Sequence, residues 1–417
     1  MSVPFVLPAL LADPAPPEDA YALRNARIFD GSGSDPFEGD VFIANGRVQT
    51  EAASGETTSI DLDGRFVMPG LIDVHTHLSL QPQVSMTEGM EKLRPEVNGH
   101  LVAAGLRRAL RMGITTVRDV GAWGDEILAI RQAVRYGAFL SPRLLICGRI
   151  VSATSPGGRH FEGMYREADG PDEMRKAARE QIRRGADLVK IMMTGARSVE
   201  YENPAPPQVT REELAALVDE VHRQGFRVAA HCEGLEGTIM AIEEGVDTIE
   251  HGFYLNQRPE YLARMAETGQ TLVPTITFLH DVVTGRHEAW SEALVERGEY
   301  NVSQAEATLV AAIEAGVNIA MGFDSTPEEK AAGELAVMVD AGMTTSDALV
   351  AATAAGARAL GLDDLIGRIA DGMIADLVIV EGDPLHDVSL LTDPQAMQLV
   401  IRGGHLAHVA PHLDPEG

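Results

Sequence analysis

The sequence predicts an α/β fold, a (β/α)8 TIM barrel of parallel strands joined to a small β-sandwich domain. The first observation behind this prediction is a change of pattern near residue 73, where apolar β-branched runs begin to alternate with amphipathic helical stretches. The second is the number of such runs, because eight can be counted before residue 325. The third is their span, since Asp73 to Asp324 is close to the roughly 250 residues of a typical barrel.

The chain divides into three predicted parts. Residues 1–20 form a Pro-rich N-terminal extension, and residues 71–362 form the barrel. The flanking segments 21–70 and 363–417 both contain short strand-like runs separated by Gly and Asp turns. We therefore expect these two flanking segments to close into one β-sandwich.

The predicted barrel strands are short apolar runs, and the helical stretches between them end close to a glycine. Glycine suits a helix end because it adopts the left-handed conformation without steric cost. The glycines in question are Gly113, Gly137, Gly185, Gly225, Gly245, Gly269 and Gly316. The strands are expected at residues 71–77, 114–120, 143–151, 187–194, 227–233, 248–252, 271–278 and 318–324.

Composition and charge exclude several classes of protein. A hydrophobic content of 45% with 23% charged residues is typical of a globular chain and argues against disorder. The net charge of −28 repels phosphate backbones and anionic lipid, so we expect no nucleic-acid partner. No run approaches about 18 apolar residues, so we expect no membrane span. Two cysteines and the absence of a basic leader favour a reducing, cytoplasmic location.

Four histidines lie near the carboxyl ends of predicted strands, where the active site of a barrel forms. His75 and His77 are two positions apart, so they point to the same face of the first strand. His231 and His251 close consecutive strands, which makes them neighbours around the barrel. A single histidine here could be a hydrogen-bonded structural group. Paired neutral imidazoles instead predict a site for Zn²⁺ or a related ion.

Lys190 and Asp324 complete the candidate site. Lys190 interrupts the apolar run DLVKIMMT, where a bare ammonium group is costly to bury. Its head could reach out of the strand end or pair with a carboxylate. Alternatively, the neutral amine could take up CO2 and become a carbamate that bridges two metal ions. Asp324 ends the eighth strand, where it could cap the next helix or ligate a metal ion and accept a proton from water.

A set of motifs spread over nearly the whole chain carries a family resemblance: FVMPGLIDVHTH, GADLVKI, VAAHCEG, DTIEHG, GFDS, MTTSDALVAAT and IADGMIADLVIV. On these motifs the sequence resembles the metal-dependent amidohydrolase superfamily. Within it, the chain is similar to the imidazolonepropionase-related group, which contains Xaa-Pro dipeptidases and ochratoxin-type amide hydrolases. The resemblance implies a distorted barrel, a β-sandwich built from both termini and a centre of two divalent metal ions, by default Zn²⁺.

The resemblance also implies a role for each ligand. His75, His77 and Asp324 would hold the more buried ion, and the histidines of the fifth and sixth strands would hold the more exposed one. A carbamate on Lys190 would bridge the ions. Two cations lower the pKa of a shared water, and Asp324 takes its proton and passes it to the leaving nitrogen. The bridging lysine argues against the deaminase branch, whose members typically use one metal ion.

The reaction expected from the resemblance is hydrolysis of a carbon–nitrogen amide bond in a small molecule by a metal-bridged hydroxide. The leading substrates are a dipeptide or an N-acyl amino acid, with an aryl amide or a carbamate as a variant. One alternative is opening of a cyclic amide such as an imidazolone. Another is a metal-binding structural protein without turnover. The resemblance further suggests a homo-oligomer.

Three departures from the family pattern concern the substrate. Many relatives carry a tyrosine two positions after the fifth-strand histidine, and this chain has Glu233 there, which weakens a dipeptidase assignment. The family's GTD is GFD, and a histidine often found after the eighth strand is missing from STPEEKAAGEL. Tyr201 and Tyr254 lie in predicted barrel-top loops, and either could replace the missing tyrosine.

Several loop residues are candidates for binding the substrate. The segment VSATSPGGRHF resembles a glycine-rich loop that supplies a substrate-contacting histidine in relatives, which here would be His160. Arg159, Arg166 and Arg197 lie in the loops after the third and fourth strands. One of these arginines could grip a substrate carboxylate in a bidentate fork, although each alone could also be a solvated surface residue.

Overall fold

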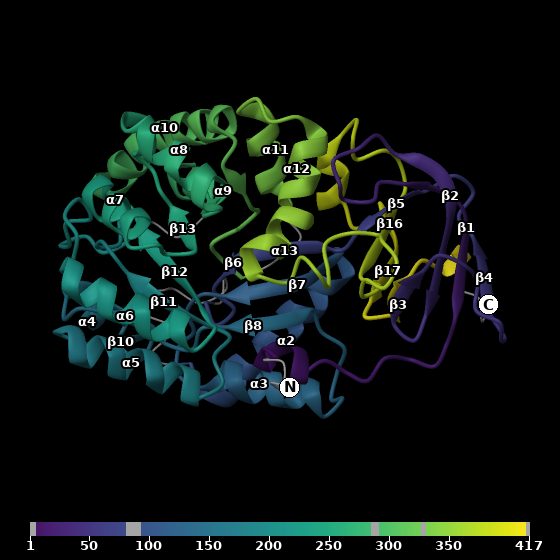
Figure 1. Ribbon diagram of the computed structural model, residues 1–417, viewed down its shortest axis with the longest axis horizontal. Coiled ribbons are helices and arrows are strands. Elements are labelled where there is room, and N and C mark those ends of the chain that lie inside the picture. The colour runs from purple at the N-terminus through teal and green to yellow at the C-terminus, as the bar shows by residue number, and fades with distance from the viewer. Residues whose placement is uncertain (1–5, 81–92, 285–291, 327–330, 414–417) are drawn as a thin grey trace.

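The structure is a computed structural model that describes residues 6–80, 93–284, 292–326 and 331–413. Parallel strands dominate its larger part, which is the α/β fold expected from the alternating pattern (Figure 1). These strands are β6 (Leu71–Thr76), β7 (Ile114–Asp119), β8 (Arg143–Ile146), β9 (Ile150–Ser152), β11 (Leu188–Met192), β12 (Arg227–Cys232), β13 (Thr248–His251), β14 (Thr271–Val273) and β15 (Asn318–Ile319).

The parallel strands follow chain order in one run from β6 to β8 and in another from β9 to β15, except that the short strand β10 (Tyr165–Glu167) pairs with the outer side of β9. Backbone bonds connect the two runs at both ends. The amide of Asp187, just before β11, donates to the carbonyl of Ile146 at 2.8 Å, and the amide of Val74 donates to the carbonyl of Met321 at 3.0 Å. The strands are therefore linked all the way round, as a TIM barrel requires.

Helices alternate with these strands and cover them (Figure 1). The seven glycines expected to end helices all have positive φ, between 70° and 92°, so that prediction is confirmed. The helices are α2 (Pro95–Arg111), α3 (Glu126–Arg135), α4 (Pro156–His160), α5 (Pro171–Arg183), α6 (Arg211–Arg223), α7 (Leu235–Glu243), α8 (Pro259–Thr268), α9 (Ile276–Val283), α10 (Glu292–Ala315), α11 (Gly333–Asp340), α12 (Thr345–Ala351) and α13 (Ala354–Leu360).

Three strand predictions differ from the structure, two in length and one in continuity. The seventh strand, expected to reach residue 278, ends at Val273 because Pro274 has no amide to donate and Thr275 turns the chain at φ 53°. Helix α9 begins at the next residue. The third strand is divided into β8 and β9 at Gly148, whose φ is 73°. In the eighth, only Asn318 and Ile319 pair with β14.

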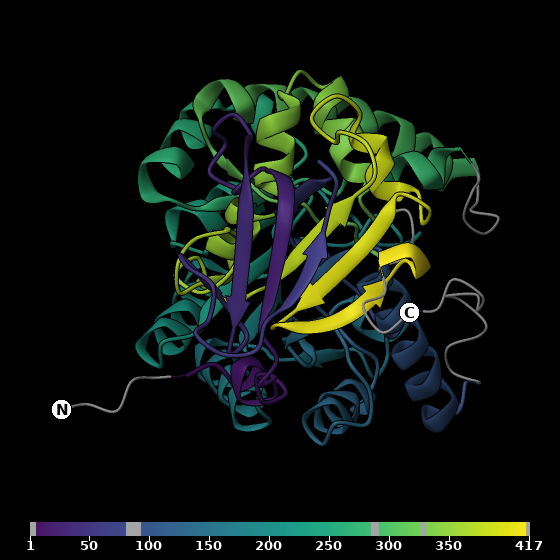
Figure 2. The same cartoon turned by 90° about the vertical axis from the view of Figure 1, so that its right-hand side faces the viewer.

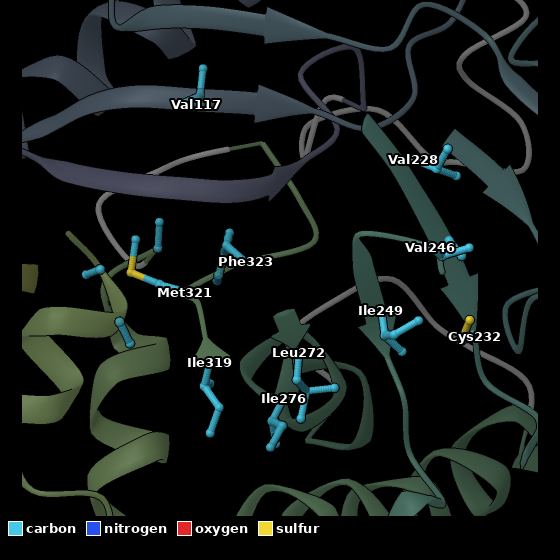
Figure 3. Close-up of a cluster of buried hydrophobic side chains, with 14 of the residues drawn as sticks. Val117, Val228, Cys232, Val246, Ile249, Leu272, Ile276, Ile319, Met321 and Phe323 are labelled. Atoms are coloured by element: carbon cyan, nitrogen blue, oxygen red, sulfur yellow. The ribbon is translucent and has the colours of Figure 1, made fainter. Parts of the chain in front are cut away.

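Apolar side chains from neighbouring strands fill the barrel wall. Figure 3 shows Val228, Ile249 and Leu272, from β12, β13 and β14, among them. Val228 is 1% exposed, and Ile249 and Leu272 are fully buried. Cys232 belongs to the same cluster, and both cysteines are buried and free. This packing holds the strand ends, and hence the site residues on them, in fixed positions.

Strands from the two ends of the chain form one eight-stranded sheet beside the barrel (Figure 2). Antiparallel pairing of β5 with β16 joins the two ends. The expected two-sheet sandwich is not confirmed, because hydrogen bonds connect all eight strands. These strands are β1 (Tyr21–Ile28), β2 (Phe37–Ala44), β3 (Arg47–Gln49), β4 (Thr58–Asp61), β5 (Phe66–Pro69), β16 (Leu377–Val380), β17 (Met397–Arg402) and β18 (His405–Val409).

The N-terminal segment docks under the barrel. Helix α1 (Pro8–Leu11) contacts β8, and the amide of Ala9 donates to Oδ1 of Asp187 at 2.7 Å. Asp13 forms ion pairs with Arg143 on β8 and with Arg402 on β17. The segment thus connects the barrel to the terminal sheet. Among the described residues, we find no helix of the length and apolar character that a membrane span requires.

Candidate metal centre

The six predicted ligands converge at the carboxyl ends of the barrel strands. Four of them lie on β6, β11, β12 and β13, the fifth directly follows β6, and Asp324 lies five positions after the end of β15. Five are buried, and the side chain of Asp324 is 11% exposed. A cavity is lined by five of them, with the sixth, His75, beside it. The full set is His75, His77, Lys190, His231, His251 and Asp324.

His75, His77 and Asp324 form the tightest part of this group. One ligand atom from each lies within 4.8 Å of the others. Oδ1 of Asp324 lies 3.1 Å from Nε2 of His75 and 3.4 Å from Nε2 of His77. The other ring nitrogen of His75 faces Oε2 of Glu250 at 2.6 Å, and that of His77 faces the carbonyl of Gly121 at 2.9 Å.

These contacts decide which ring nitrogens carry protons. A carbonyl or an ionised carboxylate can only accept, so Nδ1 is the donor in both histidines. Burial, with Lys190 nearby, lowers the pKa of His75, so its ring is neutral and its Nε2 atom presents a lone pair. The Nε2 atoms of the two histidines meet one carboxylate oxygen, and such atoms are the ligands of a cation. The donor set therefore fits a divalent metal ion.

His231 and His251 form a second pair next to this group. Nδ1 of His231 lies 3.0 Å from Nε2 of His251. Nδ1 of His251 contacts the hydroxyl of Thr275 at 2.7 Å, and Nε2 of His231 contacts the carbonyl of Gly195 at 3.4 Å. Burial, followed by the influence of His231, lowers the pKa of His251 well below its usual value. With Thr275 as acceptor, both facing nitrogens can bind one cation.

Lys190 lies between the two groups. Its side chain is 1% exposed, and its Nζ atom is buried without a hydrogen-bond partner. Burial lowers the pKa of the amine, and Arg118 lowers it further, against the opposing influence of Glu250. An unpartnered buried amine is costly in a folded protein. It fits a residue that becomes a carbamate, because the neutral amine is the form that reacts with CO2.

Glu250 and Arg118 hold the first group in place, and sequence reasoning missed both. Glu250 accepts from Arg118 Nη2 at 2.8 Å and faces His75, and Arg118 also donates to Thr248 at 3.0 Å. Burial alone would raise the pKa of Glu250, but Arg118 and Lys190 hold it below its usual range. The only sequence signal was the position of Glu250, next to His251 in TIEHG.

Strained backbone conformations occur at the proposed metal ligands. Among the described residues, six that are not glycine have positive φ. Three are Asn or Asp in the terminal sheet region, where such residues tolerate this conformation. The other three are His251 at 70°, Thr275 at 53° and Asp324 at 61°. Strained backbone at these three neighbouring positions is typical of a functional site, because the strain aims their side chains.

Of the predicted substrate contacts, Arg197 and Glu233 line the cavity. They form an ion pair with Nη1 of Arg197 2.8 Å from Oε1 of Glu233. Tyr254 donates instead to Oδ1 of Asn301 at 2.6 Å. Of the described residues, those lining the cavity do not include Tyr254, Arg159, His160, Arg166 or Tyr201. Part of the loop STPEEKAAGEL, residues 327–330, lies outside the described residues.

The rest of the cavity wall is largely apolar, and sequence reasoning missed it. These residues come from separate loops and strand ends, so no local pattern groups them. The missed apolar and aromatic residues are Leu80, Ile150, Phe161, Met164, Tyr165, Met192 and Phe278. Burial raises the pKa of Tyr165 well above its usual value. The cavity is therefore lined both by polar groups, including the histidines, and by apolar and aromatic side chains.

Comparison with known proteins gives a consistent result. The sequence profile of the Amidohydrolase family matches residues 66–407. Ochratoxinase from Aspergillus niger is 32% identical over 381 residues, which cover 84% of this chain and 77% of that protein. Imidazolonepropionase from Paracoccus denitrificans is 26% identical over 367 residues, covering 79% of this chain and 82% of that protein.

Solved structures agree with these matches. The crystal structure of A. niger ochratoxinase has a TM-score of 0.84 at 27% identity and covers 96% of this chain and 98% of its own. A Xaa-Pro dipeptidase with bound methionine in the active site has a TM-score of 0.82 at 28% identity, covering 93% of this chain and 99% of its own. The chain thus resembles both proteins along almost its whole length.

Proposed function

Because this chain belongs to the amidohydrolase family, we propose that it hydrolyses the amide C–N bond of a small molecule with two divalent metal ions. Membership supports hydrolysis of amide bonds in general. The observation that carries the proposal is the pair of Nε2 atoms that face Oδ1 of Asp324 at 3.1 and 3.4 Å. The unpartnered buried amine of Lys190 supports the second ion and its carbamate bridge.

The proposed ligands fall into two sets that share Lys190. His75, His77 and Asp324 hold the more buried ion, and the histidines on β12 and β13 hold the other. Imidazole and carboxylate donors favour Zn²⁺, our first choice, while Mn²⁺, Co²⁺ and Fe²⁺ also accept them. Bound ions polarise a substrate carbonyl and lower the pKa of a water molecule.

Asp324 is the proposed proton carrier. Oδ1 of its carboxyl group lies 3.1 Å from Nε2 of His75 and 3.4 Å from Nε2 of His77, and cations bound at this place would keep the pKa of the carboxyl group low. The carboxylate is therefore ionised near neutral pH and can accept a proton from the attacking water. It can then deliver this proton to the leaving nitrogen. The amide of Asp324 donates to the carbonyl of His75 at 2.8 Å, which fixes the carrier beside its histidine partners.

The remaining side chains orient these groups and shape the substrate site. Glu250 holds His75 in the tautomer that presents Nε2, and Thr275 does the same for His251. For the substrate we propose a linear amide. A dipeptide or an N-acyl amino acid is the first choice, and an aryl amide or a carbamate is the variant.

A hydrolysis screen tests the proposal. The protein, supplied with Zn²⁺ and bicarbonate, is assayed against Xaa-Pro and other dipeptides, N-acyl amino acids, aryl amides, carbamates and imidazolone propionate. We expect turnover of linear amides and a loss of about 10²–10⁴-fold in Asp324→Asn. The matched control is Asp340→Asn, at an exposed position at the end of α11. Equal activity of Asp324→Asn and the wild type would refute the proposal, and turnover of the cyclic substrate alone would replace the linear amide.

A further inference from the structure

The ion pair of Arg197 and Glu233 lies inside the cavity, next to the proposed metal ligands. The side chains are 6% and 2% exposed. Nη1 of Arg197 donates to Oε1 of Glu233 at 2.8 Å, and the backbone amide of Arg197 donates to Oε2 at 3.0 Å. Nε2 of His231 lies 3.3 Å from the same Oε1 atom. Each charge of the pair is thus matched by its partner within the protein.

The guanidinium group of Arg197 has further contacts, although its Nε atom is buried without a hydrogen-bond partner. Its carbon lies 5.3 Å from the ring centre of Phe253 and 5.5 Å from that of Phe278. Nη2 lies 3.4 Å from Oδ2 of Asp324. The carbonyl of Arg197 accepts from Arg297 at 3.3 Å, which fixes the backbone as well. Aromatic rings on a guanidinium group stabilise the cation in one position.

This arrangement leaves no cation for a substrate carboxylate. To grip such a group, Arg197 would have to release Glu233, whose buried carboxylate would lose its partner. The substrate carboxylate would also approach Glu233 and Asp324, which carry the same charge. Among the described residues lining the cavity, Lys190 and Arg197 are the only lysine and arginine. Lys190 is buried beside the proposed metal ligands, so it does not face the substrate's outer groups.

An apolar part of the cavity lining, which we call the Ile150–Phe161 wall, fits an uncharged group. Ile150, Phe161 and Met164 belong to one hydrophobic cluster, together with Met192. The ring of Phe161 packs edge-on against Trp123, with centroids 5.9 Å apart. Apolar walls of this kind bind alkyl and aryl groups through the area that they remove from water.

We propose that the Arg197–Glu233 pair makes this site select uncharged amides, with an alkyl or aryl group against the Ile150–Phe161 wall and no free carboxylate near the scissile bond. That the bound amide is hydrolysed rests on the proposed function. The preference for uncharged amides concerns binding and can be measured without hydrolysis. Within the proposed function, the pair therefore favours the variant substrates, neutral amides and carbamates, over the first choice of dipeptides and N-acyl amino acids, which carry a free carboxylate. Glu233, which stands where many relatives have tyrosine, is the specificity-determining residue because it neutralises Arg197.

Two pairs of compounds, in each of which the members differ only in a carboxylate, test the preference. N-Ethylbenzamide is N-benzoylalanine without its carboxylate, and propionanilide relates in the same way to succinanilic acid, with the carboxylate on the acyl side. For the wild-type holoenzyme we expect kcat/KM to be at least about tenfold higher for the neutral member of a pair. Higher kcat/KM for the acid in both pairs would overturn the proposal.

Variants of Glu233 and Arg197 test whether their ion pair causes the preference for uncharged amides. Glu233→Gln removes the charge that neutralises Arg197, so we expect the ratio of acid to neutral kcat/KM to rise by about tenfold or more. The double variant Arg197→Gln/Glu233→Gln should return the ratio toward the wild-type value. The matched control is Glu236→Gln, an exposed residue three positions away in α7. An unchanged ratio in a folded Glu233→Gln protein would overturn the role of the pair.

A binding measurement separates this inference from the proposed function. N-Ethylbenzenesulfonamide and N-benzenesulfonylalanine are uncleaved analogues of the first pair, and calorimetry measures their Kd for the wild-type holoenzyme. Tighter binding of the neutral analogue supports the inference even if no amide is hydrolysed, in which case the proposed function alone fails. Tighter binding of the acid, or of neither analogue, overturns the inference even if amides are hydrolysed.

Discussion

The barrel buries charged side chains at both of its ends, and the two ends satisfy these charges differently. At the amino end, Arg143 is fully buried and lies 2.7 Å from Asp376 and 2.9 Å from Asp13, and Asp13 also pairs with Arg402. At the carboxyl end, Arg118 pairs with Glu250 and Arg197 pairs with Glu233, but the amine of Lys190 has no partner and two imidazole nitrogens face one carboxylate oxygen. The pairs at the amino end thus leave no role for a cation, whereas the carboxyl end keeps a set of groups that a cation would satisfy.

This difference separates the residues that stabilise the fold from those that act. The pairs at the amino end join the barrel to the N-terminal segment and the terminal sheet, so they stabilise the protein as it stands. The groups at the carboxyl end are costly without a ligand and become favourable when a cation binds. Variants at the two ends should therefore have opposite effects on stability and activity.

The largest expected effect is at the carboxyl end. Lys190→Met should lower kcat/KM by about 10³-fold or more, because the proposed bridge between the ions is lost. The same change should leave the melting temperature in chelator unchanged or raise it, because an unpartnered amine is replaced by an apolar side chain. Activity assays and thermal melts check this, with Lys176→Met on exposed α5 as the control. A large fall in the melting temperature would contradict the comparison.

The opposite result is expected at the amino end. Arg143→Met leaves Asp376 and Asp13 without their shared cation, so the free energy of unfolding should fall by about 3–5 kcal/mol. The metal content should not change. The control is Arg24→Met, which removes an exposed pair with Asp40 and should cost about 0–1 kcal/mol. Denaturant titration measures the free energy of unfolding of both variants. Equal losses would show that the buried cluster stabilises the protein no more than an exposed ion pair does.

A smaller effect is expected from the residue that orients His75. Glu250→Gln replaces an acceptor that fixes the tautomer of His75, so metal affinity should fall by about 10–100-fold. Competition with a chromophoric chelator measures this affinity, and Glu260→Gln on the surface of α8 is the control. Unchanged affinity would show that the tautomer is set by other contacts.

The smallest effect concerns a pair at the amino end that titrates. His222 lies 2.8 Å from Asp247, and this hydrogen bond raises the pKa of the imidazole from 6.5. A raised pKa stabilises the folded state below about pH 6.5, and this contribution is lost as the pH rises through the folded value. Because His222 is 38% exposed, the loss should be below about 0.5 kcal/mol. Melting curves of wild type and His222→Gln between pH 5 and 8 should converge on the alkaline side if this is correct.

The parallel strands and the convergence of the proposed ligands could be predicted from the sequence. Strand positions follow from apolar periodicity, and the carboxyl ends of barrel strands must meet, so His75 and His251 come together although 176 positions apart. The family membership, inferred from the motifs around these residues, is confirmed by the profile match. The local sequence pattern was sufficient to place a residue wherever its place in the fold depends only on the strand that carries it.

The rest depended on contacts that no local pattern encodes. The apolar run at 271–278 looked like one strand, but Pro274 and the left-handed Thr275 end it early. The charges of Arg197 and Glu233 were each visible, whereas their pairing requires the spatial approach of two loops. Apolar periodicity in the terminal segments predicted strands correctly but could not distinguish one connected sheet from two facing sheets.

The most direct test of the account is the number of metal ions that the protein binds at its carboxyl end. Wild-type protein, saturated with Zn²⁺ in bicarbonate and freed of excess by gel filtration, is measured by mass spectrometry for zinc per chain, beside Lys190→Met. The account predicts two ions per wild-type chain and fewer than two in Lys190→Met. Wild-type protein without bound zinc, or an equal content in both proteins, would contradict it.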